Sequence, residues 1–111
     1  MILSAFPAMA EGVFFAPNMP DVPVTEQMMM VEDSDFSFTS DNGLMSEVIY
    51  QTPQSVSDVQ KFYAETLPSL GWDKTSDGVY RRLGDVLAIR IEKDAAQPDT
   101  IVFIEFQSKE N

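Results

Sequence analysis

Residues 55–71 read SVSDVQKFYAETLPSLG and carry the clearest helical pattern in the chain. Six apolar residues recur at close to i, i+3, i+4 spacing and therefore share one helix face. They are Val56, Val59, Phe62, Tyr63, Leu67 and Leu70. Ser57 is expected to cap the helix, with Ser55 as the competing start. Pro68 is expected to end its regular part and Gly71 to close it, so the stretch predicts one amphipathic helix that packs on a sheet.

Two strands joined by a tight turn are predicted before the helix. Residues 36–39 alternate between aromatic and hydroxyl side chains, as a half-exposed strand does. Residues 44–51 form the returning strand, which is rich in β-branched and aromatic side chains. Asn42-Gly43 lies between the strands and predicts a type I′ turn, because both central residues of that turn need a positive φ.

A meander of strands is predicted after the helix. Its strands are expected at residues 72–75, 79–83, 86–93 and 100–107. Gly84-Asp85 predicts a type II′ hairpin turn, since glycine suits the first central position of that turn. The element order is therefore β-β-α-β-β-β-β, an α+β fold in which a single helix packs on one antiparallel sheet.

The last predicted strand is apolar on both of its faces. Val102 and Phe106 share one face, and Ile101 and Phe103 share the other. The helix covers only one face of the sheet. The second face is therefore either an uncovered binding surface or dimer interface, or it is covered by residues 13–31 folding back over it.

Residues 1–31 differ in composition from the rest of the chain. They hold four of the seven prolines and six of the seven methionines. Since proline does not join a strand ladder or a helix interior, we predict an extended, irregular N-terminal arm outside the core. The arm precedes a small α+β domain at residues 32–111. The run at residues 28–31, Met-Met-Met-Val, is expected either to pack on the domain as an edge strand or to contact a partner.

The first ten residues have features of the end of a signal peptide. Residues 1–7 are mostly apolar, and Ala8-Met9-Ala10 has the small-x-small form of a signal-peptidase site. We therefore expect residues 1–10 to be a signal-peptide remnant and the protein to be periplasmic, with a cytoplasmic location as the alternative. No stretch reaches the ~20 apolar residues that cross a membrane, so no direct membrane insertion is expected.

The net charge restricts the classes of partner. The chain has 7 basic and 18 acidic residues, a net charge of −11, and residues 1–60 contain no Lys or Arg. Such a chain repels phosphate groups, so we expect no nucleic-acid binding. A basic protein or a cation is the partner that this charge favours.

The residue types also restrict the chemistry. The chain contains no Cys and no His, which excludes disulfides, thiolate or imidazole catalysis and Cys/His zinc sites. The acidic run at residues 32–35 lacks the spacing of a calcium-binding loop, and we expect a solvated loop there. Arg82 and Arg90 are expected to pair with Asp85 and Glu92, or together to bind a carboxylate. We predict no catalytic residues, no metal and no cofactor, and thus a protein that is not an enzyme.

One longer pattern resembles a known group of proteins. Residues 59–72 fit V-x-x-F-Y-x-x-x-L-P-x-L-G-W, and they are followed by Tyr80-Arg81-Arg82 and by the alternating run at residues 87–91. The combination resembles an uncharacterised family of small exported proteins of Gram-negative bacteria, over residues 19–107. The matching positions are those of a core and its turns, so the resemblance implies a fold and an exported protein, with no activity to carry over.

These observations together predict a non-enzymatic protein–protein interaction or accessory module of the cell envelope. The acidic N-terminal arm and the exposed sheet face would bind the partner. The candidate partner-binding residues are Phe14, Phe15, Met28, Met29, Met30, Ile101 and Phe103. The alternative is a small domain that binds an apolar ligand in a pocket lined by Trp72 and Tyr80. A third reading is an acidic mimic of nucleic acid that binds a basic protein.

Overall fold

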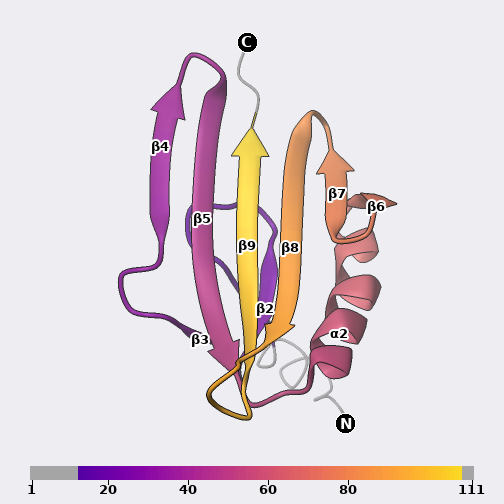
Figure 1. The fold of residues 1–111 in the computed structure, drawn as a ribbon. Helices are drawn as coiled ribbons and strands as arrows, with labels where there is room; N and C mark the ends of the chain where they lie inside the picture. Colours follow the sequence, from indigo (N-terminus) through magenta and orange to yellow (C-terminus); the bar gives the residue numbers. More distant parts are fainter. Residues whose placement is uncertain (1–12, 109–111) are drawn as a thin grey trace, which may run out of the picture.

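The computed structural model describes residues 13–108, which form a curved sheet with one helix and a pair of short strands on one side (Figure 1). The elements in chain order are β1 (Val13–Phe15), β2 (Pro23–Thr25), β3 (Met29–Met30), β4 (Phe36–Ser40), β5 (Gly43–Thr52), α2 (Val56–Ser69), β6 (Asp73–Ser76), β7 (Val79–Arg82), β8 (Asp85–Lys93) and β9 (Thr100–Ser108).

The main sheet is antiparallel and follows the order β3-β5-β9-β8-β7-β6, with β4 paired to the outer side of β5. The long strands β5, β9 and β8 form its centre (Figure 1). The predicted α+β fold, one helix on an antiparallel sheet, is confirmed. The predicted element order is only partly correct, because β1 and β2 form a separate small sheet and β3 adds to the edge of the main one.

The core lies between the sheet and α2. Alternate residues of the central strands point to this side, among them Tyr50, Ile104 and Phe106, and all three are buried. From α2 the buried residues are Val59, Tyr63 and Leu67, with Phe62 and Leu70 packed at the margin. The helix face predicted from the sequence is therefore the one that meets the sheet.

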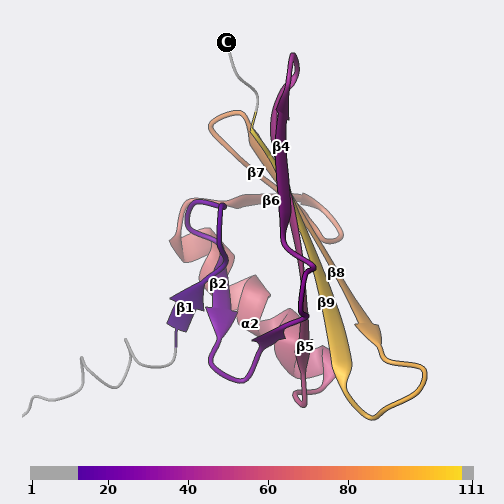
Figure 2. The same ribbon diagram turned by 90° about the vertical axis from the view of Figure 1, so that its left-hand side faces the viewer.

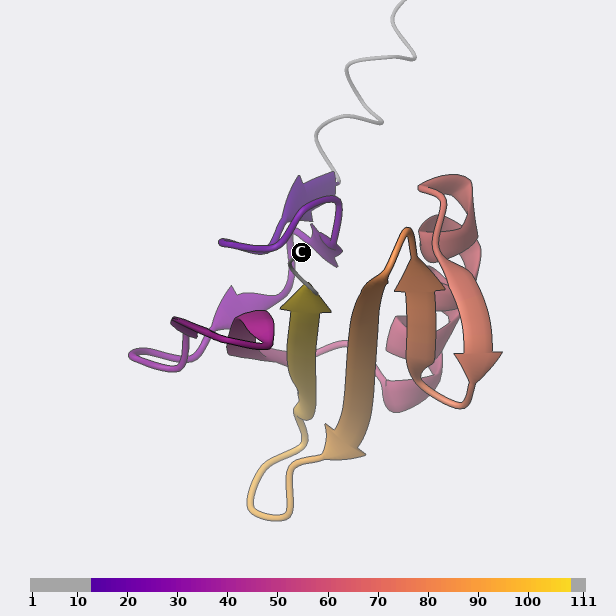
Figure 3. The same cartoon turned by 90° about the horizontal axis from the view of Figure 1, so that it is seen from above.

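The prediction of an irregular N-terminal arm outside the core is wrong for residues 13–31. Five of their side chains are buried in the core: Ala16, Met19, Val22, Val24 and Met28. The segment lies beside α2, on the same side of the sheet (Figures 2 and 3). The physical reason is area, since a helix of 14 residues is too narrow to cover a wide sheet. The prolines make the path of this segment irregular, but its apolar side chains are still buried.

The ends of α2 differ in part from the prediction. Ser55 is the N-cap, because its hydroxyl accepts a hydrogen bond of 3.0 Å from the backbone N–H of Asp58. The predicted cap at Ser57 is therefore wrong, and the competing start is the correct one. Pro68 lies inside the last turn instead of before the end. Gly71 does close the helix, with a φ of +92° and its N–H bonded to the Pro68 carbonyl at 3.1 Å.

Both predicted hairpin turns are displaced by one residue. Ser40 pairs with Gly43, so that Asp41 and Asn42 connect β4 to β5 and only Gly43 has a positive φ. Arg82 likewise pairs with Asp85 across the second hairpin. Leu83 and Gly84 therefore form that turn, both with positive φ, as in a type I′ turn and not the predicted type II′.

Candidate interaction surface

The second face of the main sheet is the candidate interaction surface, and we call it the open face. Within residues 13–108, α2, β1 and β2 all lie on the opposite side, and no element covers this one (Figure 2). Of the two arrangements that the sequence left open, residues 13–31 do fold back, but they add to the helix side. The open face is therefore an uncovered surface.

Apolar side chains gather on the open face, and we call this group the apolar patch. It consists of Phe36 and Phe38 from β4, Met45 and Ile49 from β5, and Ile101 and Phe103 from β9. The two β4 rings lie 5.4 Å apart and are 54% and 44% exposed. Single exposed apolar residues are common on soluble proteins, whereas several on one sheet face favour an interaction site.

Strand register brings the members of the apolar patch together. Phe38 lies opposite Met45, and Ile49 lies opposite Phe103. Residues that face each other across antiparallel strands have Cβ atoms about 5 Å apart, so their side chains touch. The patch therefore runs across three neighbouring strands from the β4 edge toward the middle of the sheet.

A cation covers the inner end of the apolar patch. The guanidinium group of Arg90 lies 4.0 Å from the centre of the Phe103 ring. Its Nε also donates to a carboxylate oxygen of Glu92 at 2.7 Å, as the sequence predicted for this pair. Because Arg90 is held by both contacts, its charge is already matched within the protein.

Two glutamates face each other within the apolar patch, between the Phe38–Met45 row and the Ile49–Phe103 row. Glu47 on β5 pairs directly with Glu105 on β9. Burial, then the charge of Glu47 and a hydrogen bond with it, raise the pKa of Glu105 above its ordinary value. A surface hollow of about 270 Å³ lies over this point and is lined by both carboxylates together with Ile49, Arg90 and Phe103.

The structure separates the predicted partner-binding residues. Ile101 and Phe103 lie on the open face, as expected, and Met29 is 71% exposed in the same row, since both it and Ile101 pair with Gln51. Met30 is partly exposed but lies opposite Tyr50, which points to the helix side.

The other predicted residues are not part of the open face. Met28 is only 7% exposed, with its sulfur 3.9 Å from the Tyr63 hydroxyl, so it belongs to the core and is not accessible to a partner. Phe14 and Phe15 are about half exposed on β1, in the layer beside α2 (Figure 2). The structure therefore does not bring these two aromatic residues together with Ile101 and Phe103.

Four members of the apolar patch are not among the predicted partner-binding residues. They are Phe36, Phe38, Met45 and Ile49, which the sequence places on strands but on no particular face. The alternation of Phe36 and Phe38 around a hydroxyl residue was the available signal. Only the register of the β4–β5 hairpin shows that these residues share a face with Phe103. The predicted turn is one residue out of place and therefore gives the wrong register.

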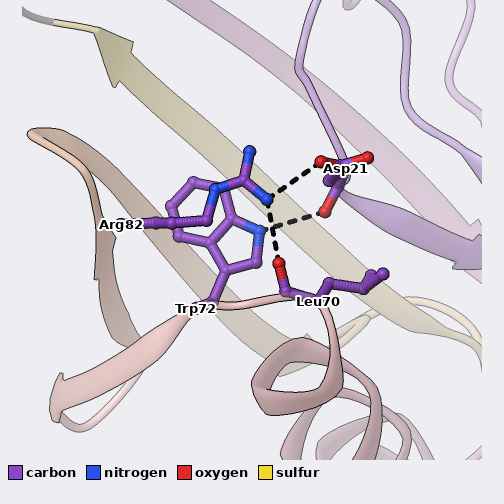
Figure 4. A network of polar contacts seen from close by, with 4 residues as sticks. All are labelled: Asp21, Leu70, Trp72 and Arg82. Atoms are coloured by element: carbon purple, nitrogen blue, oxygen red, sulfur yellow. Dashed lines mark hydrogen bonds and ion pairs between the residues drawn. The ribbon is translucent and has the colours of Figure 1, made fainter.

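The two residues proposed to line a ligand pocket, Trp72 and Tyr80, do not line a hollow together. Trp72 is 1% exposed, its ring packs edge-on against Phe106, and its Nε1 donates to the Asp21 carbonyl at 3.0 Å (Figure 4). Tyr80 instead lines a hollow of about 450 Å³ between α2 and β8, which also contains charged residues such as Lys74. Trp72 is thus a core residue.

Arg82 connects three segments around Trp72 (Figure 4). Its Nη1 donates to the Asp21 carboxylate and to the Leu70 carbonyl, each at 2.9 Å, and its guanidinium lies 4.7 Å from the centre of the Trp72 ring. The predicted partner was Asp85, whereas the structure pairs Arg82 with an acid of the N-terminal segment. These contacts fasten that segment to the domain.

The remaining observations bear on other classes of function. Residues 13–108 contain no group of three acidic side chains placed to hold a metal ion. No helix in that range is long and apolar enough to cross a bilayer. The predicted signal-peptide remnant, residues 1–10, lies outside the described residues. No family model matches the sequence, and no curated protein or solved structure is significantly similar to it.

Proposed function

We propose that the protein is a non-enzymatic interaction module of the cell envelope that binds another protein through the open face of its sheet. The observation that carries the proposal is the apolar patch, because six apolar side chains gather on a sheet face that no element within residues 13–108 covers. An antiparallel sheet that keeps water on one face normally presents polar side chains there. Aromatic and branched apolar residues in their place favour burial against a partner.

The rest of the molecule supports a binding role. The helix side of the sheet is closed by α2 and by residues 16–28, and Trp72 is part of that closed core. The N-terminal segment contributes Met29 at the margin of the open face, while most of its apolar residues stabilise the fold. We place the module in the periplasm, in line with the signal-peptide pattern at residues 1–10 and with the resemblance to small exported bacterial proteins.

Quantitative co-purification from envelope extracts tests the proposal. The tagged full chain is compared with the double variant Phe36→Ser/Phe38→Ser and with the control Leu83→Ser, since Leu83 is apolar and 97% exposed but lies at the β7–β8 turn. All β4 side chains are exposed, so the double variant should keep the fold, which circular dichroism checks.

We expect a specific protein to be recovered with the wild-type chain and the Leu83 variant, and to be lost with the β4 variant. Recovery of the same proteins with all three chains would contradict a role for the open face.

A further inference from the structure

The glutamate pair indicates what kind of surface fits the open face. Glu47 and Glu105 lie in the row between Phe36 on β4 and Ala88 on β8, next to the Ile49–Phe103 row. Within residues 13–108, neither carboxylate has a basic side chain within ion-pair distance, because Arg90 pairs with Glu92. Any partner that covers the apolar patch also covers these two acids.

The cost of covering the two carboxylates distinguishes the possible partners of the open face. A purely apolar partner would remove two adjacent carboxylates from water without compensation, which is costly. A second copy of this chain would bring a net charge of −11 and a glutamate pair of its own, so repulsion would oppose a dimer through this face. A basic side chain would instead exchange the repulsion between the carboxylates for attraction.

We propose that the open face binds an apolar protein surface that carries one Lys or Arg, whose cationic group lies between Glu47 and Glu105. This inference rests on the proposed function. The apolar patch on β4, β5 and β9 provides the apolar contact. The hollow of about 270 Å³ over the pair provides space for the head of a long basic side chain. The ring of Phe103, already under Arg90, forms one wall of that hollow.

The carboxylate pair should make this docking depend on pH. Among the strands within residues 13–108, the other charged groups on the open face are Arg90 and Glu92 on β8, Arg81 on β7 and Asp73 on β6, whereas β4 has none. A cation binds more strongly when Glu105 is ionised, and Glu105 keeps its proton to a higher pH than an isolated glutamate. Affinity for a basic partner therefore rises as the pH increases through the pKa of Glu105.

Amide shifts in NMR spectra of the full chain test the inference with defined probes. The probe is a short acetylated peptide of alternating valine and threonine with one central lysine, and the matched peptides carry glutamine or glutamate there. We expect the lysine peptide to shift the amides of Ile49 and Phe103 and to bind about tenfold more tightly than the glutamine peptide. The glutamate peptide should bind more weakly still.

Two variants supply the matched control. Glu105→Gln should lower the affinity for the lysine peptide about tenfold, whereas Glu65→Gln makes the same charge change on the exposed side of α2 and should have no effect. Lysine and glutamine peptides that bind alike, absence of any shift, or equal behaviour of the two variants would overturn the inference.

Sedimentation equilibrium tests the competing occupant, a second copy of this chain. A dimer of the wild-type chain that is absent in the Phe36→Ser/Phe38→Ser variant would overturn the inference as well. If co-purification still depends on the β4 aromatics while the lysine preference is absent, the inference fails and the proposed function stands. Co-purification that is independent of β4 instead overturns the proposed function.

Discussion

At the residue scale, Arg82 joins the N-terminal segment to the end of α2 and to Trp72. It bonds to Asp21 and to the Leu70 carbonyl and lies over Trp72 (Figure 4). We expect Arg82→Ala to lower the free energy of unfolding by about 2 kcal/mol, because two charge-assisted hydrogen bonds and a cation–π contact are lost. Urea denaturation measures the change. The neighbouring Arg81 is exposed, and Arg81→Ala should stay within about 0.5 kcal/mol of the wild type. Equal effects would refute this anchoring role.

Glu105 gives a prediction about pH. A raised pKa means that the folded state holds the proton more tightly than the unfolded chain, whose glutamate titrates near its ordinary value of 4.5. The folded state therefore loses stability as the pH rises from that value through the raised pKa, and the loss persists above it. Glu105→Gln should stabilise the protein at pH 7 by a few tenths of a kcal/mol, as removing a cross-strand like-charge pair does.

The gain from Glu105→Gln should shrink as the pH falls below 4.5, because Glu105 is then increasingly protonated in both the folded and the unfolded state. Thermal unfolding across this pH range measures it. If Glu105→Gln lowers stability at neutral pH, the proposed repulsion between Glu47 and Glu105 is wrong.

Two glycines separate the effects of backbone strain and of close contact. Gly78 and Gly84 both have positive φ, of +73° and +91°. A Cβ at Gly78 would lie 2.6 Å from the Ile89 carbonyl oxygen, whereas one at Gly84 would meet nothing within 4 Å. We expect Gly84→Ala to cost about 1 kcal/mol and Gly78→Ala at least about twice that. Guanidinium unfolding of the two variants tests the difference, and equal costs would show that the carbonyl contact does not matter.

At the scale of elements, the N-terminal segment is part of the folding unit. Val22, Val24 and Met28 are each buried, and each such side chain contributes about 2 kcal/mol through burial. Their sum is comparable to the whole stability of a small domain. A chain that starts at Glu32 should therefore lose its near-UV circular dichroism and its cooperative unfolding transition.

A milder variant tests the same point without truncation. Val22→Ala should cost about 2 kcal/mol, while Glu26→Ala, exposed in the same segment, should cost little. A truncated chain that unfolds as cooperatively as the full one would show that the segment is an independent arm after all.

The elements that could be predicted from the sequence are those with a clear period. The spacing of Val59, Tyr63 and Leu67 gives the helix and its buried face, and the alternation along β8 and β9 gives the central strands. The buried N-terminal segment could not be predicted, because its apolar residues are irregularly spaced between prolines and follow neither period. Its burial depends on sheet area left uncovered by α2, which is a property of the assembled fold.

The open face was predictable only in part. Ile101 and Phe103 could be placed on it because the alternation within one strand is enough for that. The contributions of β4 and β5 depend on register across the hairpin, and a shift of one residue reverses every side chain. The pairing of Glu47 with Glu105 also joins strands far apart in the sequence, so local patterns carry no signal for it.

At the scale of the whole molecule, charge and apolar surface are arranged in a way that suits one kind of contact. A net charge of −11 keeps the chain soluble and disfavours association with itself or with other anions. The open face nevertheless presents aromatic rings to water. The two properties fit together if the apolar patch is reserved for a partner of opposite charge, because electrostatic repulsion then excludes most other contacts.

The central claim is that the open face is buried against another protein, and site-specific photo-cross-linking in cells tests it most directly. A photoreactive phenylalanine analogue is placed at Phe103, on the open face, and separately at Leu83, which is exposed outside it. We predict a covalent adduct with one other protein from position 103 and none from position 83. Absence of an adduct at 103, or the same adduct from both positions, would contradict the claim.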